Sequence, residues 1–110
     1  MQFGLRVRQL RVGQELTQRE LAKRLGVSVS YISKVENDNL HFGDYPSEKF
    51  IHKLATELKG DENELLLLAD KVPSELRKRI RERPDVFQRV ANLDDKTMDR
   101  LMQHMDKLNN

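Results

Sequence analysis

Apolar residues recur along this chain every three or four positions, and no segment shows the strict apolar–polar alternation of a half-buried strand. Phe3, Val7 and Leu10 share one face of the first such segment. Comparable spacings return in every later segment, down to Leu108 near the carboxyl terminus. The pattern therefore predicts an all-α protein.

Capping and turn residues separate the first three helices. The sequence "TQRE" at residues 17–20 is typical of a capping box, which begins a second helix after a break near Gly13. Gly26 is expected to end that helix, and Ser28 is a suitable N-cap for a third. Residues 37–46 are rich in turn formers and predict a loop.

Two more helices complete the first two-thirds of the chain. A fourth begins after Ser47 and is expected to end at Gly60. Asp61 then caps a fifth helix. Its expected buried side chains are Leu65, Leu66 and Leu68.

Three shorter amphipathic segments follow residues 71–73. The basic run at residues 74–83 has Leu76 and Ile80 on its inner side, Pro84 suits the first position of the next helix, and Asp94 caps the last one. The sequence thus predicts a boundary between a five-helix domain, residues 1–71, and a three-helix carboxy-terminal region, residues 72–110.

Composition and motifs remove several classes of function. The chain has no cysteine, so disulfides and thiolate zinc sites are excluded. His41, His52 and His104 have no ligand spacing, and no catalytic motif is visible, so we expect neither an enzyme nor a metal or cofactor. The longest apolar run, Leu65 to Ala69, is too short to span a membrane, and no signal-peptide pattern is present, which favours a cytoplasmic location.

Charge is distributed unevenly along the chain. Residues 1–36 have a net charge of +4, whereas residues 37–71 have a net charge of −4. A basic front and an acidic back would orient the protein toward a polyanion such as DNA. Ordinary solvated helix faces could give the same counts, so charge alone decides nothing.

The segment from Gln18 to Asn37 carries the functional signal. Ala22 is small where two helices would approach closely, and Gly26 can adopt a positive φ in the turn between them. The expected outer face of the second of these helices holds mostly short side chains, which would let its backbone approach base edges in a major groove. These outward residues are Val29, Ser30, Ser33 and Lys34.

Four sequence pieces together resemble one known family. They are "VRQLR" at residues 7–11, "LTQRELAKRLGVS" at 16–28, "YISKVEN" at 31–37, and "FIHKLATEL" with "DENELL" in the fourth and fifth predicted helices. Residues 4–68 resemble the phage-repressor-like (Xre/Cro-type) helix-turn-helix regulators. The resemblance implies a five-helix lambda-repressor-like domain that binds double-stranded DNA sequence-specifically.

The resemblance also implies roles for individual residues. Gln18 matches a residue that holds a phosphate and buttresses the recognition helix, Tyr31 a position used for the DNA backbone or for packing, and Arg11 with Glu36 a structural ion pair. Base-edge or phosphate contacts are implied for several positions of the third helix. The full expected DNA-binding set is Gln18, Arg19, Lys23, Ser28, Val29, Ser30, Tyr31, Ser33, Lys34 and Asn37.

The chain departs from the family pattern just after the third helix. Asp38 stands where the family commonly has glycine, and residues 37–46 contain Asp38 and Asp44 but no lysine or arginine. Contacts from this loop to the DNA backbone are therefore in question. Phosphate binding would depend on helix N-termini, on Gln18, Arg19 and Lys23, and on any contribution from the basic run.

The carboxy-terminal region offers two further patterns. An apolar stripe at coiled-coil-like spacing favours a homodimer over packing against its own chain; it consists of Met98, Leu101, Met102, Met105 and Leu108. The run "RKRIRER", Arg77 to Arg83, is either a second phosphate contact or a solvated face, and its distance from the recognition segment favours the latter.

Together these features predict a homodimeric transcriptional regulator, by default a repressor, on a palindromic operator. Two-fold pairing would set the half-sites about 34 Å apart. Two alternatives remain open at this point: a DNA-binding antitoxin whose residues 72–110 cover a toxin, and a protein-interaction module that has lost DNA binding.

Overall fold

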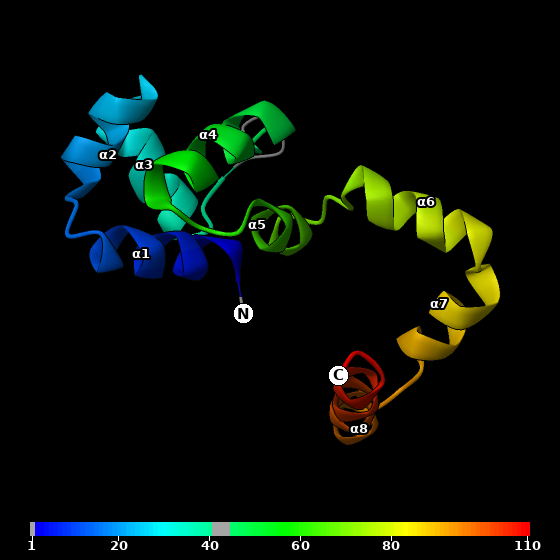
Figure 1. Cartoon of the computed structure of the whole chain (residues 1–110). Helices are drawn as coiled ribbons and strands as arrows, with labels where there is room; N and C mark the ends of the chain where they lie inside the picture. Colours follow the sequence, from blue (N-terminus) through cyan, green and yellow to red (C-terminus); the bar gives the residue numbers. More distant parts are fainter. Residues whose placement is uncertain (1, 41–44) are drawn as a thin grey trace. The chain divides into compact units, whose positions relative to one another are not determined.

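The computed structural model describes residues 2–40 and 45–110 of the chain, and these form eight helices and no strand (Figure 1). The prediction of an all-α fold is confirmed. The chain divides into two compact units, Met1–Pro73 and Ser74–Asn110, called unit 1 and unit 2 below. Each unit is described separately.

Unit 1 is a five-helix domain with a closed apolar core. Its helices are α1 (Phe3–Gly13), α2 (Gln18–Leu25), α3 (Val29–Glu36), α4 (Glu48–Leu58) and α5 (Glu62–Leu68). Helix α3 packs against α1 and α2, while α4 packs against α2 and α5 (Figure 1). The buried apolar side chains are Phe3, Val7, Leu16, Leu21, Ala22, Leu25, Ile32, Val35, Ile51, Leu54, Ala55, Leu58, Leu65 and Leu66.

Local capping begins four of these helices. At α2 both bonds of the capping box form: Thr17 Oγ1 accepts from Glu20 N at 3.0 Å, and Glu20 Oε1 accepts from Thr17 N at 3.1 Å. The hydrogen bond from the Thr17 backbone lowers the pKa of Glu20. Ser28, Ser47 and Asp61 cap α3, α4 and α5 through the amide three residues on.

The glycines end helices differently from one another. Gly26 has φ 70°, the left-handed conformation that glycine adopts without strain, and it terminates α2. At the ends of α1 and α4, however, the left-handed residues are Glu15 and Lys59, with φ 57° and 53°. Gly13 is the last residue of α1 and Gly60 follows the cap of α4, so neither of them provides the reversal.

Two other expectations need comment. Leu68 is only half-buried, so its predicted burial was wrong; α5 ends at that residue, and the chain leaves the core there. Part of the predicted loop at residues 37–46, including His41 and Asp44, lies outside the described residues.

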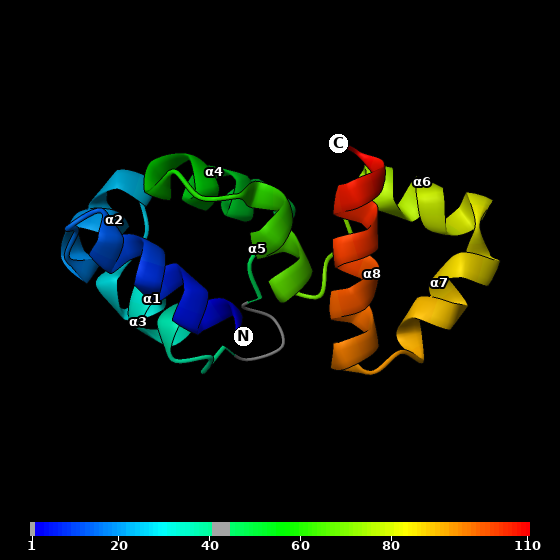
Figure 2. The same cartoon turned by 60° about the horizontal axis from the view of Figure 1, so that its bottom comes forward.

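Unit 2 contains α6 (Ser74–Glu82), α7 (Pro84–Ala91) and α8 (Asp95–Leu108), shown in Figure 2. Helix α6 packs against α7. Asp94 Oδ1 caps α8 by accepting from Thr97 N at 2.8 Å, and the hydrogen bonds to Thr97 lower the pKa of this carboxyl. Nevertheless no residue of Ser74–Asn110 is buried, and Leu76 and Ile80 are only half-buried.

The helices of the described segments, residues 2–40 and 45–110, are each too short or too polar to cross a lipid bilayer.

Candidate DNA-binding site

The geometry of the site begins with the packing between α2 and α3. Leu21 and Leu25 of α2 and Ile32 and Val35 of α3 are all buried. Ala22 is 2% exposed. A left-handed Gly26 connects the two helices with a short turn. Because the apolar side chains fill the angle between the helices, the remaining positions of α3 must face outward.

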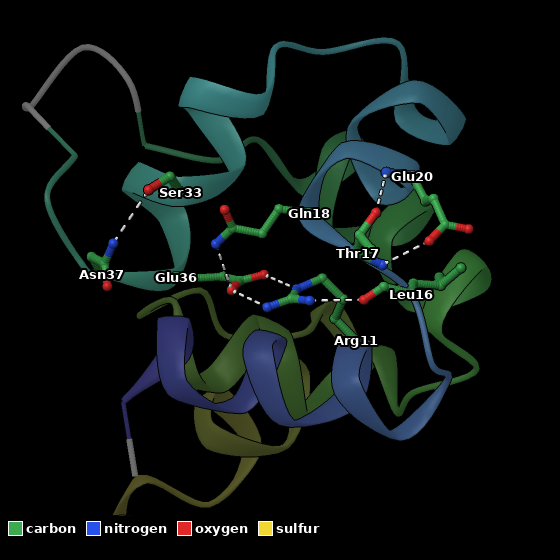
Figure 3. Close-up of polar contacts among 8 residues, drawn as sticks. All are labelled: Arg11, Leu16, Thr17, Gln18, Glu20, Ser33, Glu36 and Asn37. Carbon is green, nitrogen blue, oxygen red and sulfur yellow. Dashed lines mark hydrogen bonds and ion pairs between the residues drawn. The ribbon is translucent and has the colours of Figure 1, made fainter.

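One buried carboxylate fixes the position of α3. The Glu36 side chain is 1% exposed, and it accepts from Arg11 Nε at 2.6 Å, Arg11 Nη2 at 3.0 Å and Gln18 Nε2 at 3.1 Å (Figure 3). Arg11 Nη1 also donates to the Leu16 carbonyl oxygen at 2.7 Å. A charge buried this deeply is tolerated only when its hydrogen bonds are satisfied. The network ties α1, α2 and α3 together at the carboxyl end of the recognition helix.

Gln18 points toward this network, as Figure 3 shows. The resemblance implied two roles for Gln18, a phosphate contact and a buttress for the recognition helix. The bond from its amide nitrogen to Glu36 has the form of the buttress. The phosphate contact stays a prediction.

The outer surface of α3 is exposed at its leading positions. Val29, Ser30 and Lys34 are exposed, and Ser33 is half-buried. Ser33 Oγ accepts from Asn37 Nδ2 at 3.3 Å, a contact that extends along the same helix surface (Figure 3). Ser28 is exposed as well, with its hydroxyl occupied by the α3 cap.

The other residues of the expected set lie around this surface. Arg19 and Lys23 are exposed on α2. Tyr31 is half-buried, and its ring packs edge-on against Phe50 of α4 with 5.4 Å between centroids. That contact is consistent with the packing alternative for Tyr31.

Two residues that position α3 could not be identified from the sequence. Asp38 has φ 54°, the left-handed conformation that glycine usually supplies, and its Oδ1 accepts from Gly4 N at 3.2 Å. Gly4 itself lies so close to α3 that an added Cβ would be 2.3 Å from the Val35 carbonyl oxygen. Asp38 therefore caps the amino end of α1, where a negative charge is favourable, and this gives the departure from the family pattern a structural role. Neither contact has a local signal, because each joins residues more than thirty positions apart.

The histidines of the described residues have ordinary surroundings. His52 contacts Glu62 through Nδ1 on the surface, and His104 is exposed on α8. Within residues 2–40 and 45–110, no three His, Cys, Asp or Glu side chains are grouped as a metal site would require.

A short-turned helix pair with an exposed second helix, held by a buried ion pair, defines a DNA-binding helix-turn-helix protein. Comparison with known proteins agrees: the helix-turn-helix family model matches residues 7–65. The chain belongs to this family. It is thus a DNA-binding transcriptional regulator by family and by fold.

A solved structure resembles almost the whole chain. It comes from the complex of the SinR protein with the SinI protein, and the similar chain is 25% identical with a TM-score of 0.53. The similarity covers 97% of each chain, so it includes unit 2 as well as the helix-turn-helix domain. Among curated proteins, no sequence matches this chain.

Proposed function

We propose that this protein is a transcriptional repressor that binds a palindromic operator as a homodimer. The observation that carries the proposal is the exposed leading surface of α3 on a helix pair fixed by the Glu36 network. A repressor of this kind acts by occupying DNA that the polymerase must use.

Base recognition would come from the outer residues of α3. Lys34 can donate to guanine acceptors, and the Val29 methyl groups can contact a thymine methyl. Ser30 and Ser33 are short enough to let the helix backbone approach the base edges. Arg19 and Lys23, with the amino ends of α2 and α3, would hold phosphates and so contribute affinity without sequence preference.

Dimerisation would come from unit 2. Along α8 the apolar side chains remain uncovered: Leu101 is 37% exposed and Leu108 is 70% exposed. Met102 and Met105 are exposed beside them. A stripe of this kind at coiled-coil-like spacing is stable when a second helix covers it. Pairing through α8 would present two recognition helices to two half-sites.

A second candidate partner follows from the same stripe. The similar SinR chain was solved together with a different protein, SinI. A different protein could likewise cover α8 of this chain in place of a second copy. Sedimentation of the purified protein alone separates the two candidates, since a homodimer forms without any added partner.

Selection of bound fragments from random duplex DNA tests the main proposal. The enriched fragments should contain two inverted half-sites with centres about one helical turn, roughly 34 Å, apart. A single, unpaired half-site would contradict the homodimer but not DNA binding. If no sequence is enriched even at low salt, the repressor proposal is wrong.

Two substitutions should then separate recognition from affinity. Lys34→Ala is expected to relax base preference at one position of each half-site, at a cost of about 1–3 kcal/mol. Arg19→Ala should instead weaken binding to all sequences and reduce the salt slope by about one. Lys53→Ala, which removes an exposed cation from α4, serves as the control and should change neither quantity. Equal losses from Lys34→Ala on operator and random DNA would contradict the assignment to base contacts.

A further inference from the structure

Helix α6 carries a strongly basic surface that unit 1 does not explain. Arg77, Lys78 and Arg81 are exposed. Residues that are three or four positions apart lie on the same side of a helix, and neighbours in sequence are separated by about 100°. The three cations therefore occupy one side of α6, away from the half-buried Leu76 and Ile80. We call this surface, Arg77 with Lys78 and Arg81, the α6 basic face.

The ion pairs of unit 2 leave this face without a counter-charge. Arg79 Nη1 pairs with Glu82 at 2.8 Å, and Arg83 Nη2 pairs with Asp85 at 3.0 Å. The hydrogen bond from Arg83 lowers the pKa of Asp85.

None of the three cations of the α6 basic face has an ion pair or a side-chain hydrogen bond to any residue in 2–40 or 45–110. The nearby carboxylates are thus used by other arginines, and the face keeps three unneutralised charges.

Unit 1 has a shortage where this surplus would be useful. The segment that follows the recognition helix contains no lysine or arginine between residues 37 and 46, and Asp38 caps α1. The backbone of a duplex flanking the operator core would meet few cations there. Exposed lysines and arginines gathered on one surface of a DNA-binding protein are the electrostatic signature of phosphate contacts.

We infer that the α6 basic face binds the phosphate backbone of the duplex that flanks the operator. The inference rests on the proposed function, because it requires DNA bound by α3. It adds a second contact surface that supplies affinity and salt dependence but no base preference. Acidic protein surfaces are a different partner class, and three cations along one side of a helix match a row of phosphates better than scattered carboxylates.

The test compares two triple variants of the full chain. The first replaces the α6 basic face (Arg77→Gln, Lys78→Gln and Arg81→Gln). The control removes the same charge from exposed positions of α8 outside its apolar stripe (Lys96→Gln, Arg100→Gln and Lys107→Gln). Circular dichroism and sedimentation confirm that both variants keep the helices and the assembly of the unmodified protein.

Binding is measured by fluorescence anisotropy on two duplexes at several salt concentrations. One duplex is the selected operator with flanks of ten base pairs on each side, and the other is the operator core alone. On the flanked duplex the α6 variant should bind about 10-fold more weakly, and its slope of log affinity against log salt should fall by about 2.7, which is about 0.9 for each lost contact. On the core duplex it should match the unmodified protein, and the ranking of operator mutants should not change.

The outcomes distinguish this inference from the function it rests on. An unchanged affinity and salt slope for the α6 variant on the flanked duplex overturn the inference and leave the face to an acidic protein or to solvent. An equal loss in the α8 control also overturns it, since net charge would then be the cause. If the unmodified protein prefers no sequence, the proposed function fails; if it prefers one and the α6 variant loses only the salt slope, both are supported.

Discussion

The two units of this chain are built from helices of similar amphipathic character, but only one of them encloses a core. In unit 1 side chains such as Leu21, Ile51 and Leu54 are fully buried. In unit 2 no side chain reaches that state, and Leu101 and Leu108 remain exposed. The difference therefore lies in how many helices close around a common centre.

Chain length explains much of this difference. Unit 2, Ser74–Asn110, is shorter than the roughly 40 residues below which a domain usually needs a metal, disulfides or a partner. The sequence has no cysteine, so a disulfide cannot supply the missing stability. An assembly partner remains as the source, which is why we place dimerisation in unit 2 and base recognition in unit 1.

The largest expected contrast concerns two ion pairs, one in each unit. Glu36→Gln removes a buried charge from the Arg11 network and leaves that guanidinium without its partner. We expect a loss of about 3–5 kcal/mol in the free energy of unfolding. Tyrosine fluorescence in a urea titration measures it, because Tyr31 and Tyr45 both belong to unit 1 and the chain has no tryptophan.

The control for this contrast is Glu82→Gln in unit 2. It breaks the exposed pair with Arg79, and such surface pairs contribute little. The urea midpoint of unit 1 should therefore stay the same. A comparable loss for both variants would mean that burial does not separate the two regions.

A second contrast compares equal truncations of two leucines. Leu54→Ala leaves a cavity in the core of unit 1 and should cost about 2–5 kcal/mol of unfolding free energy at every protein concentration. Leu101→Ala removes the same atoms from the α8 stripe. It should leave the tyrosine-detected transition within about 0.5 kcal/mol but shift sedimentation toward the monomer and weaken operator binding.

The concentration dependence decides whether this second contrast holds. A subunit interface responds to dilution, whereas a monomeric core does not. If Leu101→Ala leaves the sedimentation of the protein unchanged, α8 is not the dimer interface. If it lowers the unit 1 transition as Leu54→Ala does, the division into a self-sufficient domain and an assembly region is wrong.

Much of unit 1 could be predicted because its signals are local. The capping box at Thr17, the cap at Ser28 and the left-handed Gly26 each act within a few residues, so the pattern of the sequence contains them. The apolar spacing likewise identified Ile32 and Val35 as core positions. The Arg11–Glu36 pair came from the family resemblance, since nothing local connects residues 25 positions apart.

The remaining features depend on contacts between distant segments. The left-handed conformations of Glu15 and Lys59, next to glycines that do not adopt them, are set by how the following helices pack. The bond between Asp38 and the Gly4 amide has no sequence signature. In unit 2, periodicity indicated which side chains are apolar, but only the structure shows that the chain itself leaves them uncovered.

The smallest expected effect tests how little space the helix packing of unit 1 leaves. In Gly4→Ala the new Cβ would lie 2.3 Å from the Val35 carbonyl oxygen and 2.7 Å from that of Glu36, and both are backbone atoms that cannot rotate away. Helix α1 must then move from α3, at a cost of about 1–3 kcal/mol in the urea titration. Gly13→Ala is the matched control, because nothing lies within 4 Å of its added Cβ and alanine favours a helix by about 0.5–1 kcal/mol over glycine. A Gly4→Ala protein as stable as the Gly13→Ala protein would show that α1 and α3 are not in the close contact on which the orientation of the recognition helix depends.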